Sequence, residues 1–104
     1  MRYMRISLLI PRPGEEQEVA RLIDQLLSEY AKQPGFVSGY KVRAVDGTAQ
    51  IGRVTVWESS EHADATAQLD RVLALRSELQ PLIQEDSHIE PSFEALDASE
   101  PLAV

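Results

Sequence analysis

The sequence predicts a small α+β domain in which a four-stranded antiparallel sheet carries helices on one face. Segments with strand-like alternation and segments with helical spacing follow one another in the order strand, helix, strand, strand, helix, strand. An Asp-Gly turn between the two middle strands is typical of a hairpin. A length of 104 residues suits a single domain. We therefore expect one compact unit built around one sheet.

The first strand is predicted over residues 3–10, where every second residue shares a face, and a Pro-Arg-Pro-Gly run ends it. A helix over residues 15–32 follows, because apolar residues recur along it at spacings of three and four. Glutamates in its first turn complement the helix dipole. Pro34-Gly35 ends this helix.

The middle strands are predicted over residues 36–45 and 50–58, with the hairpin turn at 45–48. Ser59 or Ser60 then caps a second helical region, in which Asp70 marks a break into two segments. Pro81 ends or kinks that region. A last strand covers residues 88–96, and Pro91 within it favours an edge position or a bulge.

This order predicts a ferredoxin-like βαββαβ unit over residues 1–96, followed by a C-terminal tail at 97–104. We expect the aliphatic faces of the strands to meet the helices, namely Met4, Ile6, Leu8, Val54 and Val56. The opposite face would then be bare, although it carries Tyr3, Leu9, Thr55 and Trp57. A second copy of the chain would cover it, so we expect a homodimer through the sheet face.

Composition and charge exclude several classes of function. The formal net charge of −7 argues against nucleic-acid binding and against anionic membrane surfaces. No apolar run approaches the length of about 20 residues that spans a bilayer. The absence of cysteine excludes disulfides, thiolate metal sites and cysteine nucleophiles. We expect a cytoplasmic protein with no metal site and no cofactor.

No general catalytic motif is present, so candidate residues are few. Trp57, the only tryptophan, either lines a pocket for a flat ligand or fills core. The two histidines, at 62 and 88, are interpreted as surface residues. Basic residues on the strands either hold an anionic ligand or pair with Glu90 and Glu94. Arg5 and Arg53 share one face of the sheet. Lys41 and Arg43 lie on that face only if the helices cover Phe36, Tyr40 and Val42.

The order of elements, Gln33-Pro34-Gly35-Phe36 and the run Val54-Thr55-Val56-Trp57-Glu58-Ser59 together resemble the antibiotic biosynthesis monooxygenase-like group of dimeric α/β barrels. The resemblance covers roughly residues 3–96. It implies a homodimer with facing sheets and a pocket between sheet and helices in each protomer. Members include cofactor-independent oxygenases acting on polycyclic aromatic substrates, haem-degrading enzymes and proteins without an assigned activity.

The haem-degrading members use an asparagine on the first strand, a tryptophan at the end of the third strand and a histidine on the second helix. Trp57 matches the tryptophan, but the chain has no asparagine, and Ser7 or Arg5 occupies that neighbourhood. His62 lies in the first turn of its helix, away from the place of the family's ligand. Haem degradation is therefore not expected.

The resemblance leaves three alternatives open. The chain is a cofactor-independent oxygenase on a small aromatic substrate, a non-catalytic homodimeric domain that binds a small molecule or a partner, or an isomerase or lyase. For the first, the candidate pocket residues are Trp57, Tyr30, Tyr40, Arg53 and Ser7. Fold alone does not decide among these functions.

Overall fold

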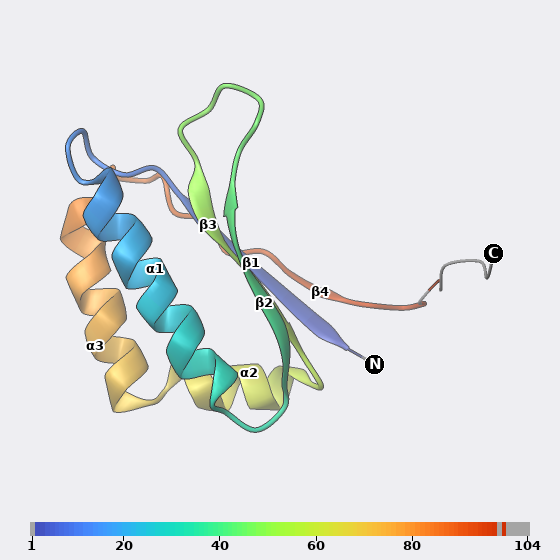
Figure 1. The fold of residues 1–104 in the computed structure, drawn as a ribbon. Coiled ribbons are helices and arrows are strands. Elements are labelled where there is room, and N and C mark those ends of the chain that lie inside the picture. Colours follow the sequence, from blue (N-terminus) through green and yellow to red (C-terminus); the bar gives the residue numbers. More distant parts are fainter. Residues whose placement is uncertain (1, 98, 100–104) are drawn as a thin grey trace.

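The computed structural model describes residues 2–97 and 99. Its strands form one antiparallel sheet in the order β2-β3-β1-β4, and its helices pack together on one side of that sheet (Figure 1). The elements, in chain order, are β1 (Tyr3–Leu9), α1 (Glu16–Ala31), β2 (Phe36–Arg43), β3 (Ile51–Trp57), α2 (Ser60–Ala67), α3 (Asp70–Leu79), a 3-10 turn (Gln80–Leu82) and β4 (Ser92–Glu94). The predicted α+β, ferredoxin-like class is confirmed.

The predicted boundaries hold within a few residues for most elements. The second helical region is divided, as predicted, with α3 beginning at Asp70. Ser59 is the cap of α2, and its hydroxyl accepts a hydrogen bond from the His62 amide. The last strand is shorter than predicted, because β4 begins only after Pro91 and lies at the sheet edge. Most of the predicted tail lies outside the described residues.

The predicted assignment of the two sheet faces is wrong. Leu9 and Trp57 are 1% and 2% exposed and belong to the core formed with the helices. Because side chains alternate along a strand, Met4, Ile6 and Val54 face away from the helices and are only partly buried. The prediction placed the more aliphatic face against the helices, but the helix-facing side is the one that mixes aromatic, apolar and polar residues.

On the outer strand β2, basic residues lie on one face and Tyr40 and Val42 lie on the other. On β2, Lys41 lies on the helix-facing side, where its amino group contacts Asp24 of α1 at 2.9 Å. Tyr40 lies on the opposite side and is 59% exposed. Lys41 and Arg43 therefore share the face of Arg5 and Arg53, although Tyr40 points away from the helices and not toward them.

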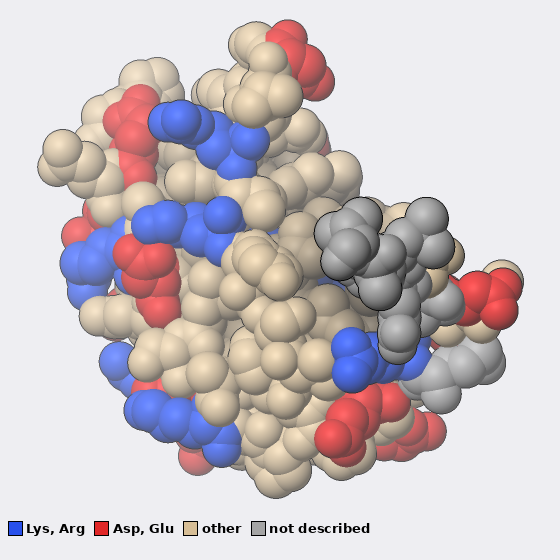
Figure 2. Space-filling view, turned by 45° about the vertical axis from the view of Figure 1, so that its right-hand side comes forward, with Lys and Arg blue, Asp and Glu red and all other residues tan. Residues whose placement is uncertain are grey.

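The face of the sheet opposite the helices is referred to below as the open face. It is defined by the residues Met4, Ile6, Leu8, Tyr40, Val42, Val54, Val56, Ile89 and Phe93. Three of these are large apolar side chains that remain about half exposed, at 59%, 48% and 50% for Tyr40, Ile89 and Phe93. Figure 2 brings this side of the molecule forward and shows a broad uncharged area bordered by charged side chains. Within the described residues, no helix is long and apolar enough to cross a membrane.

Candidate functional site

Three polar side chains are buried on the helix-facing side of the sheet. Ser7, Arg53 and Thr55 are 1%, 4% and 4% exposed. Ser7 and Arg53 are directly opposite each other in the pairing of β1 with β3, and Thr55 lies two residues further along β3. Burying such groups costs free energy unless they are hydrogen-bonded or paired. Ser7 and Thr55 have hydrogen-bond partners, so among these three residues the main cost of burial falls on Arg53.

A small cavity lies over these residues, between the sheet and the helices. Its walls are Arg5, Ser7, Tyr30, Arg53, Thr55, Trp57, Ala63, Ala67, Arg76 and Glu90. About 20 Å³ of it is open to the centre of a water molecule. A second cavity of about 30 Å³, which includes His88 and Leu79, shares Arg53 and Arg76 with the first. Each has room for one or two water molecules, so a larger ligand requires the helices to move.

The inner end of the cavity is aromatic. Trp57 lies at the end of β3, and the edges of two further rings contact it. The Tyr30 ring from α1 has its centroid 5.9 Å away at an interplanar angle of 66°, and the Phe36 ring is 5.4 Å away at 85°. Such edge-to-face packing fixes the indole in place. One wall of the cavity is therefore a rigid aromatic surface.

Arg53 is the least satisfied group in this region. Its Nη1 is the one buried side-chain nitrogen or oxygen without a hydrogen-bond partner within the described part of the chain. Its guanidinium carbon lies 5.7 Å from the centroid of the Tyr30 ring, a cation–π arrangement. The ring contact offsets part of the desolvation cost but provides no acceptor for the N–H groups.

The outer end of the cavity is closed by ion pairs that involve Glu90. Arg76 of α3 donates a hydrogen bond to Glu90 at 3.0 Å, and the Nε of Arg5 lies 3.9 Å from the same carboxylate. The side chains of Arg5, Glu90 and Arg76 are 20%, 22% and 33% exposed. Since the residues at the inner end are almost fully buried, this partly exposed set marks the mouth of the cavity.

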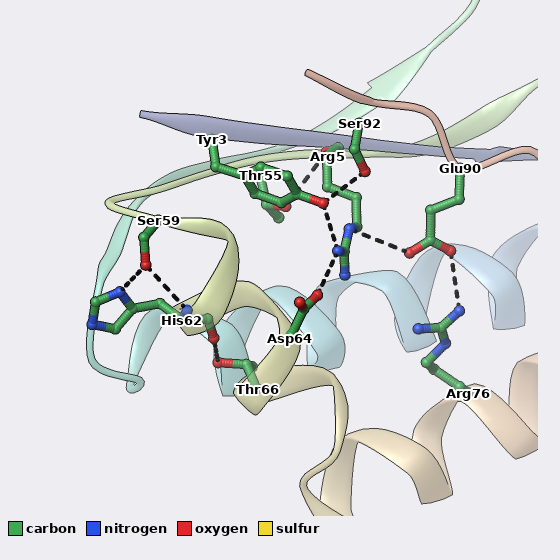
Figure 3. A network of polar contacts seen from close by, with 10 residues as sticks. All are labelled: Tyr3, Arg5, Thr55, Ser59, His62, Asp64, Thr66, Arg76, Glu90 and Ser92. Carbon is green, nitrogen blue, oxygen red and sulfur yellow. Dashed lines mark hydrogen bonds and ion pairs between the residues drawn. The ribbon is translucent and has the colours of Figure 1, made fainter. Parts of the chain in front are cut away.

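The polar network continues from the mouth across the edge of the sheet (Figure 3). Arg5 donates hydrogen bonds to Asp64 of α2 at 3.0 Å and to the Tyr3 hydroxyl at 2.6 Å, and Tyr3 donates to Ser92 at 2.8 Å. Burial lowers the pKa of Arg5, but the bonds to Tyr3 and Asp64 outweigh it and raise that pKa above its ordinary value. Asp64 is 69% exposed, so its pair with Arg5 contributes little and opens readily.

His88 lies beside the polar interior rather than on an open surface. Its Nε2 lies 2.8 Å from the Ser7 hydroxyl and 3.2 Å from a Glu90 carboxylate oxygen. Burial lowers the pKa of His88 below its ordinary value of 6.5. Glu90 opposes this change, while Arg53 and Arg76 add to it. His88 is therefore uncharged at neutral pH.

The structure brings four of the five candidate pocket residues together around one cavity: Ser7, Tyr30, Arg53 and Trp57. Tyr40 does not join them, because it lies on the open face. Sequence reasoning missed Arg76 and treated Glu90 and His88 only as a pairing partner and a surface residue. The alternation that places His88 and Glu90 on one face of the last strand was the available signal.

The described residues contain no group of three or more His, Asp or Glu side chains placed to hold a metal ion. His62 lies apart from the cavity. Its Nδ1 is 2.7 Å from the Ser59 hydroxyl, and its ring fills the space above Gly35, where an added Cβ would clash with it. Gly35 has a φ of +82°, so glycine suits this position for two reasons. His62 thus has a structural role in packing α2 against the turn after α1.

Solved structures with the same fold share little sequence with this chain. The cofactor-independent oxygenase SnoaB from Streptomyces nogalater is 18% identical, with a TM-score of 0.81 over 93% of this chain and 95% of that one. Rv0793 from Mycobacterium tuberculosis is 17% identical, with a TM-score of 0.85 over 96% and 100%. A conserved protein from Methanosarcina mazei is 13% identical, with a TM-score of 0.82 over 89% and 91%. No curated protein sequence matches.

At these identities the structural likeness establishes the fold alone. The family model described as antibiotic biosynthesis monooxygenase matches residues 2–78, which covers β1 through most of α3 and includes Arg53, Trp57 and Arg76. His88 and Glu90 lie beyond the matched range. The chain therefore belongs to the antibiotic biosynthesis monooxygenase family.

Proposed function

We propose that the protein is a cofactor-independent oxygenase that acts on a small aromatic substrate held between the sheet and the helices. The observation that carries the proposal is the buried polar group of Ser7, Arg53 and Thr55 beside Trp57. Polar side chains that lower stability in a small core are a recurrent feature of functional sites. Family membership and the fold shared with SnoaB support the same reaction class.

The proposed reaction replaces a methylene group of the substrate by a carbonyl group. For a ring methylene next to an aromatic ketone, R₂CH₂ and O₂ give R₂C=O and H₂O. The substrate loses a proton to form an enolate, the enolate transfers electrons to O₂, and the resulting hydroperoxide loses water. The chain's residues bind and orient the flat ring against Trp57 and Tyr30, and their polar groups stabilise negative charge on the substrate oxygen.

Substrate entry requires the mouth of the cavity to widen, since the closed cavity holds only water. One contact at this mouth is the exposed pair between Arg5 and Asp64, which joins β1 to α2. Exposed ion pairs of this kind contribute about 0–1 kcal/mol to the free energy of unfolding. Breaking this pair therefore costs little, whereas moving α2 also uncovers Ala63 and Thr66, which are 3% and 4% exposed.

The test is oxygen uptake with anthrone as the probe substrate, with anthraquinone measured as the product. We expect uptake above the uncatalysed rate, strong reduction in Trp57→Ala and partial retention in Trp57→Phe. Because truncating a buried aromatic residue costs about 3–5 kcal/mol, each variant is assayed well below its unfolding midpoint. Leu73→Ala, at an exposed apolar position of α3, is the control. Uptake that is equal in Trp57→Ala and the wild type would contradict the proposal.

A non-catalytic homodimeric domain that binds a small molecule or a partner is the second candidate, and it is favoured by an interior that is nearly filled. Glu90 already pairs with Arg5 and Arg76, as expected for a filled interior. Arg53, whose Nη1 has no hydrogen-bond partner in the described part of the chain, favours the first candidate. Stabilisation of the fold by anthrone or a quinone, by RT ln(1 + [L]/Kd), without any oxygen uptake would identify the second.

We further propose that two copies of the chain pair through the open face, with the helices outside. Half-exposed Tyr40, Ile89 and Phe93 border partly buried aliphatic residues there. An apolar area of this extent is typical of an interface, and two sheets pack face to face readily. Each protomer would retain its own cavity, on the other side of its sheet.

A further inference from the structure

We propose that the cavity binds its ligand as an anion, with Arg53 holding a negatively charged ligand oxygen. The proposal rests on the proposed function only in taking the ligand to be aromatic and small. It adds the class of ligand: an aromatic carboxylate or an enolate, in preference to the neutral molecule of the same shape.

The first argument is the state of Arg53 itself. Arg53 is 4% exposed, and its Nη1 has no acceptor within the described residues. A guanidinium stays charged under all ordinary conditions, so an uncompensated one in the interior is strongly unfavourable. An anionic oxygen in the adjoining cavity would supply the missing acceptor.

The second argument is the balance of charge around the cavity. Arg5, Arg53 and Arg76 line it, and Glu90 is the one carboxylate among its lining residues. That carboxylate is already engaged by Arg5, Arg76 and His88. The lining thus has a formal excess of two positive charges in a chain whose net charge is −7, and Asp64, outside the lining, offsets one of them by its pair with Arg5. A local excess of this sign attracts anions into the cavity.

The third argument is geometric. The Arg53 guanidinium packs against the Tyr30 ring, with its carbon 5.7 Å from the ring centroid. A guanidinium that lies over a ring face makes no hydrogen bond with it, so its N–H groups stay available for a ligand oxygen. Trp57 lines the same cavity, so a ligand oxygen at Arg53 places the attached aromatic ring beside the indole.

The same charges affect the acidity of an enolisable substrate. A nearby positive charge favours the ionised form of an acid and lowers its pKa. Arg53 therefore promotes formation of the enolate that reacts with oxygen. A carboxylate-bearing substrate would use the same contact for binding alone. The two sources of anionic oxygen give different results in the experiment below.

The experiment uses the fluorescence of Trp57, because the chain has one tryptophan and it lines the cavity. Two matched pairs of flat probes are titrated at pH 8. The carboxylate pair is 2-naphthoate and 2-naphthamide, and the enolate pair is 1,3-indanedione and 1-indanone. We expect at least one anion to bind about tenfold or more tightly than its neutral partner, as for loss of one charge-assisted hydrogen bond.

Arg53→Met is the test variant, and Arg71→Met is the control, because Arg71 is exposed on α3 and does not line the cavity. We expect Arg53→Met to lose the preference for the anion, Arg53→Lys to restore part of it, and Arg71→Met to keep it. We also expect Arg53→Met to unfold at the same or a higher temperature, since it removes a buried unpaired charge. A purely structural arginine would show the opposite change in stability.

Equal affinity for both members of each pair, or an Arg53→Met variant that keeps the preference, would overturn the proposal, as would no binding of any anion. Preference for the carboxylate alone assigns Arg53 to ligand binding, and preference for the enolate extends its role to substrate ionisation. Anion preference without oxygen uptake from anthrone leaves this site in place and removes the oxygenase. Oxygen uptake from anthrone that is unchanged in Arg53→Met removes the role of Arg53 in substrate ionisation and leaves the oxygenase.

Discussion

Glu90 determines the charge arrangement at the mouth of the cavity. One carboxylate receives a hydrogen bond from Arg76, lies 3.9 Å from Arg5 and contacts His88 at 3.2 Å. It cannot pair with every cation that lines the cavity, and within residues 2–97 and 99 the Nη1 of Arg53 is left without an acceptor. The positive excess in the interior is thus a consequence of one acidic residue shared among several basic ones.

The lowered pKa of His88 predicts a pH dependence of stability. Below the ordinary value of 6.5, the unfolded chain binds a proton at this histidine while the folded chain resists it. Above about pH 6.5, His88 should therefore not lower the free energy of unfolding. As the pH falls toward the lower pKa of the folded state, the free energy of unfolding should decline. In His88→Gln this decline should be absent. The measurement is denaturant unfolding at intervals between pH 5 and pH 8.

Carboxylates whose pKa is lowered act in a different range, which keeps the histidine effect separable. Hydrogen bonds hold the pKa of Glu18 and Glu61 below the ordinary value of 4.5, so their contribution is lost only in more acidic solution. Identical unfolding curves for the wild type and His88→Gln between pH 5 and pH 7 would show that His88 is not linked to the interior charges.

The residues of the site were only partly predictable from the sequence. Trp57 was identified because a single tryptophan at a strand end is unusual, and Arg53 because a basic residue in a strand needs a partner. Arg76 and Glu90 are 14 residues apart and lie on a helix and on the segment before β4. The contact between their side chains depends on the angle at which α3 crosses the sheet. The periodicity of apolar residues in strands and helices does not specify that angle.

At the scale of elements, α2 and α3 form two separate helices around the cavity. Leu69, between them, has an extended backbone with φ −65° and ψ 138°, which ends one helix and starts the next. The sequence predicts this division at Asp70, and Asp70 is the first residue of α3. Periodicity along α1 and the Asp-Gly hairpin were equally informative, because both signals are local and need no knowledge of the sheet.

The cap of α2 gives a prediction with an internal control. Ser59 accepts a hydrogen bond from the His62 amide at 3.3 Å, while Ser60 is already the first helical residue. We expect Ser59→Ala to lower the free energy of unfolding by about 1 kcal/mol, as for other serine caps. Ser60→Ala should be near neutral. Chemical denaturation of the two variants side by side measures the difference, and equal effects would argue against a specific cap.

At the scale of the whole molecule, the wrong assignment of the sheet faces has a clear physical cause. The prediction ranked the faces by aliphatic content and gave the richer one, with Ile6 and Val54, to the helices. In the structure the helices cover the face with Ser7 and Arg53. Hydrophobic content ranks two faces correctly only when one of them is exposed to water. Here the helix-facing side holds a polar cavity, and the open face is apolar.

The open face predicts how the oligomer responds to a single charge. Ile6 lies near the middle of this face, directly opposite Val54 in the sheet, and is partly buried in one protomer. Ile6→Lys would place an amino group at the centre of the proposed interface, where burying an unpaired charge is costly. We expect sedimentation to give twice the chain mass of 11.6 kDa for the wild type and the single-chain mass for Ile6→Lys.

Leu73→Lys, at an exposed apolar position on α3, should stay dimeric, because the helices lie outside the proposed interface. A dimer that survives Ile6→Lys but not Leu73→Lys would place the interface on the helices instead.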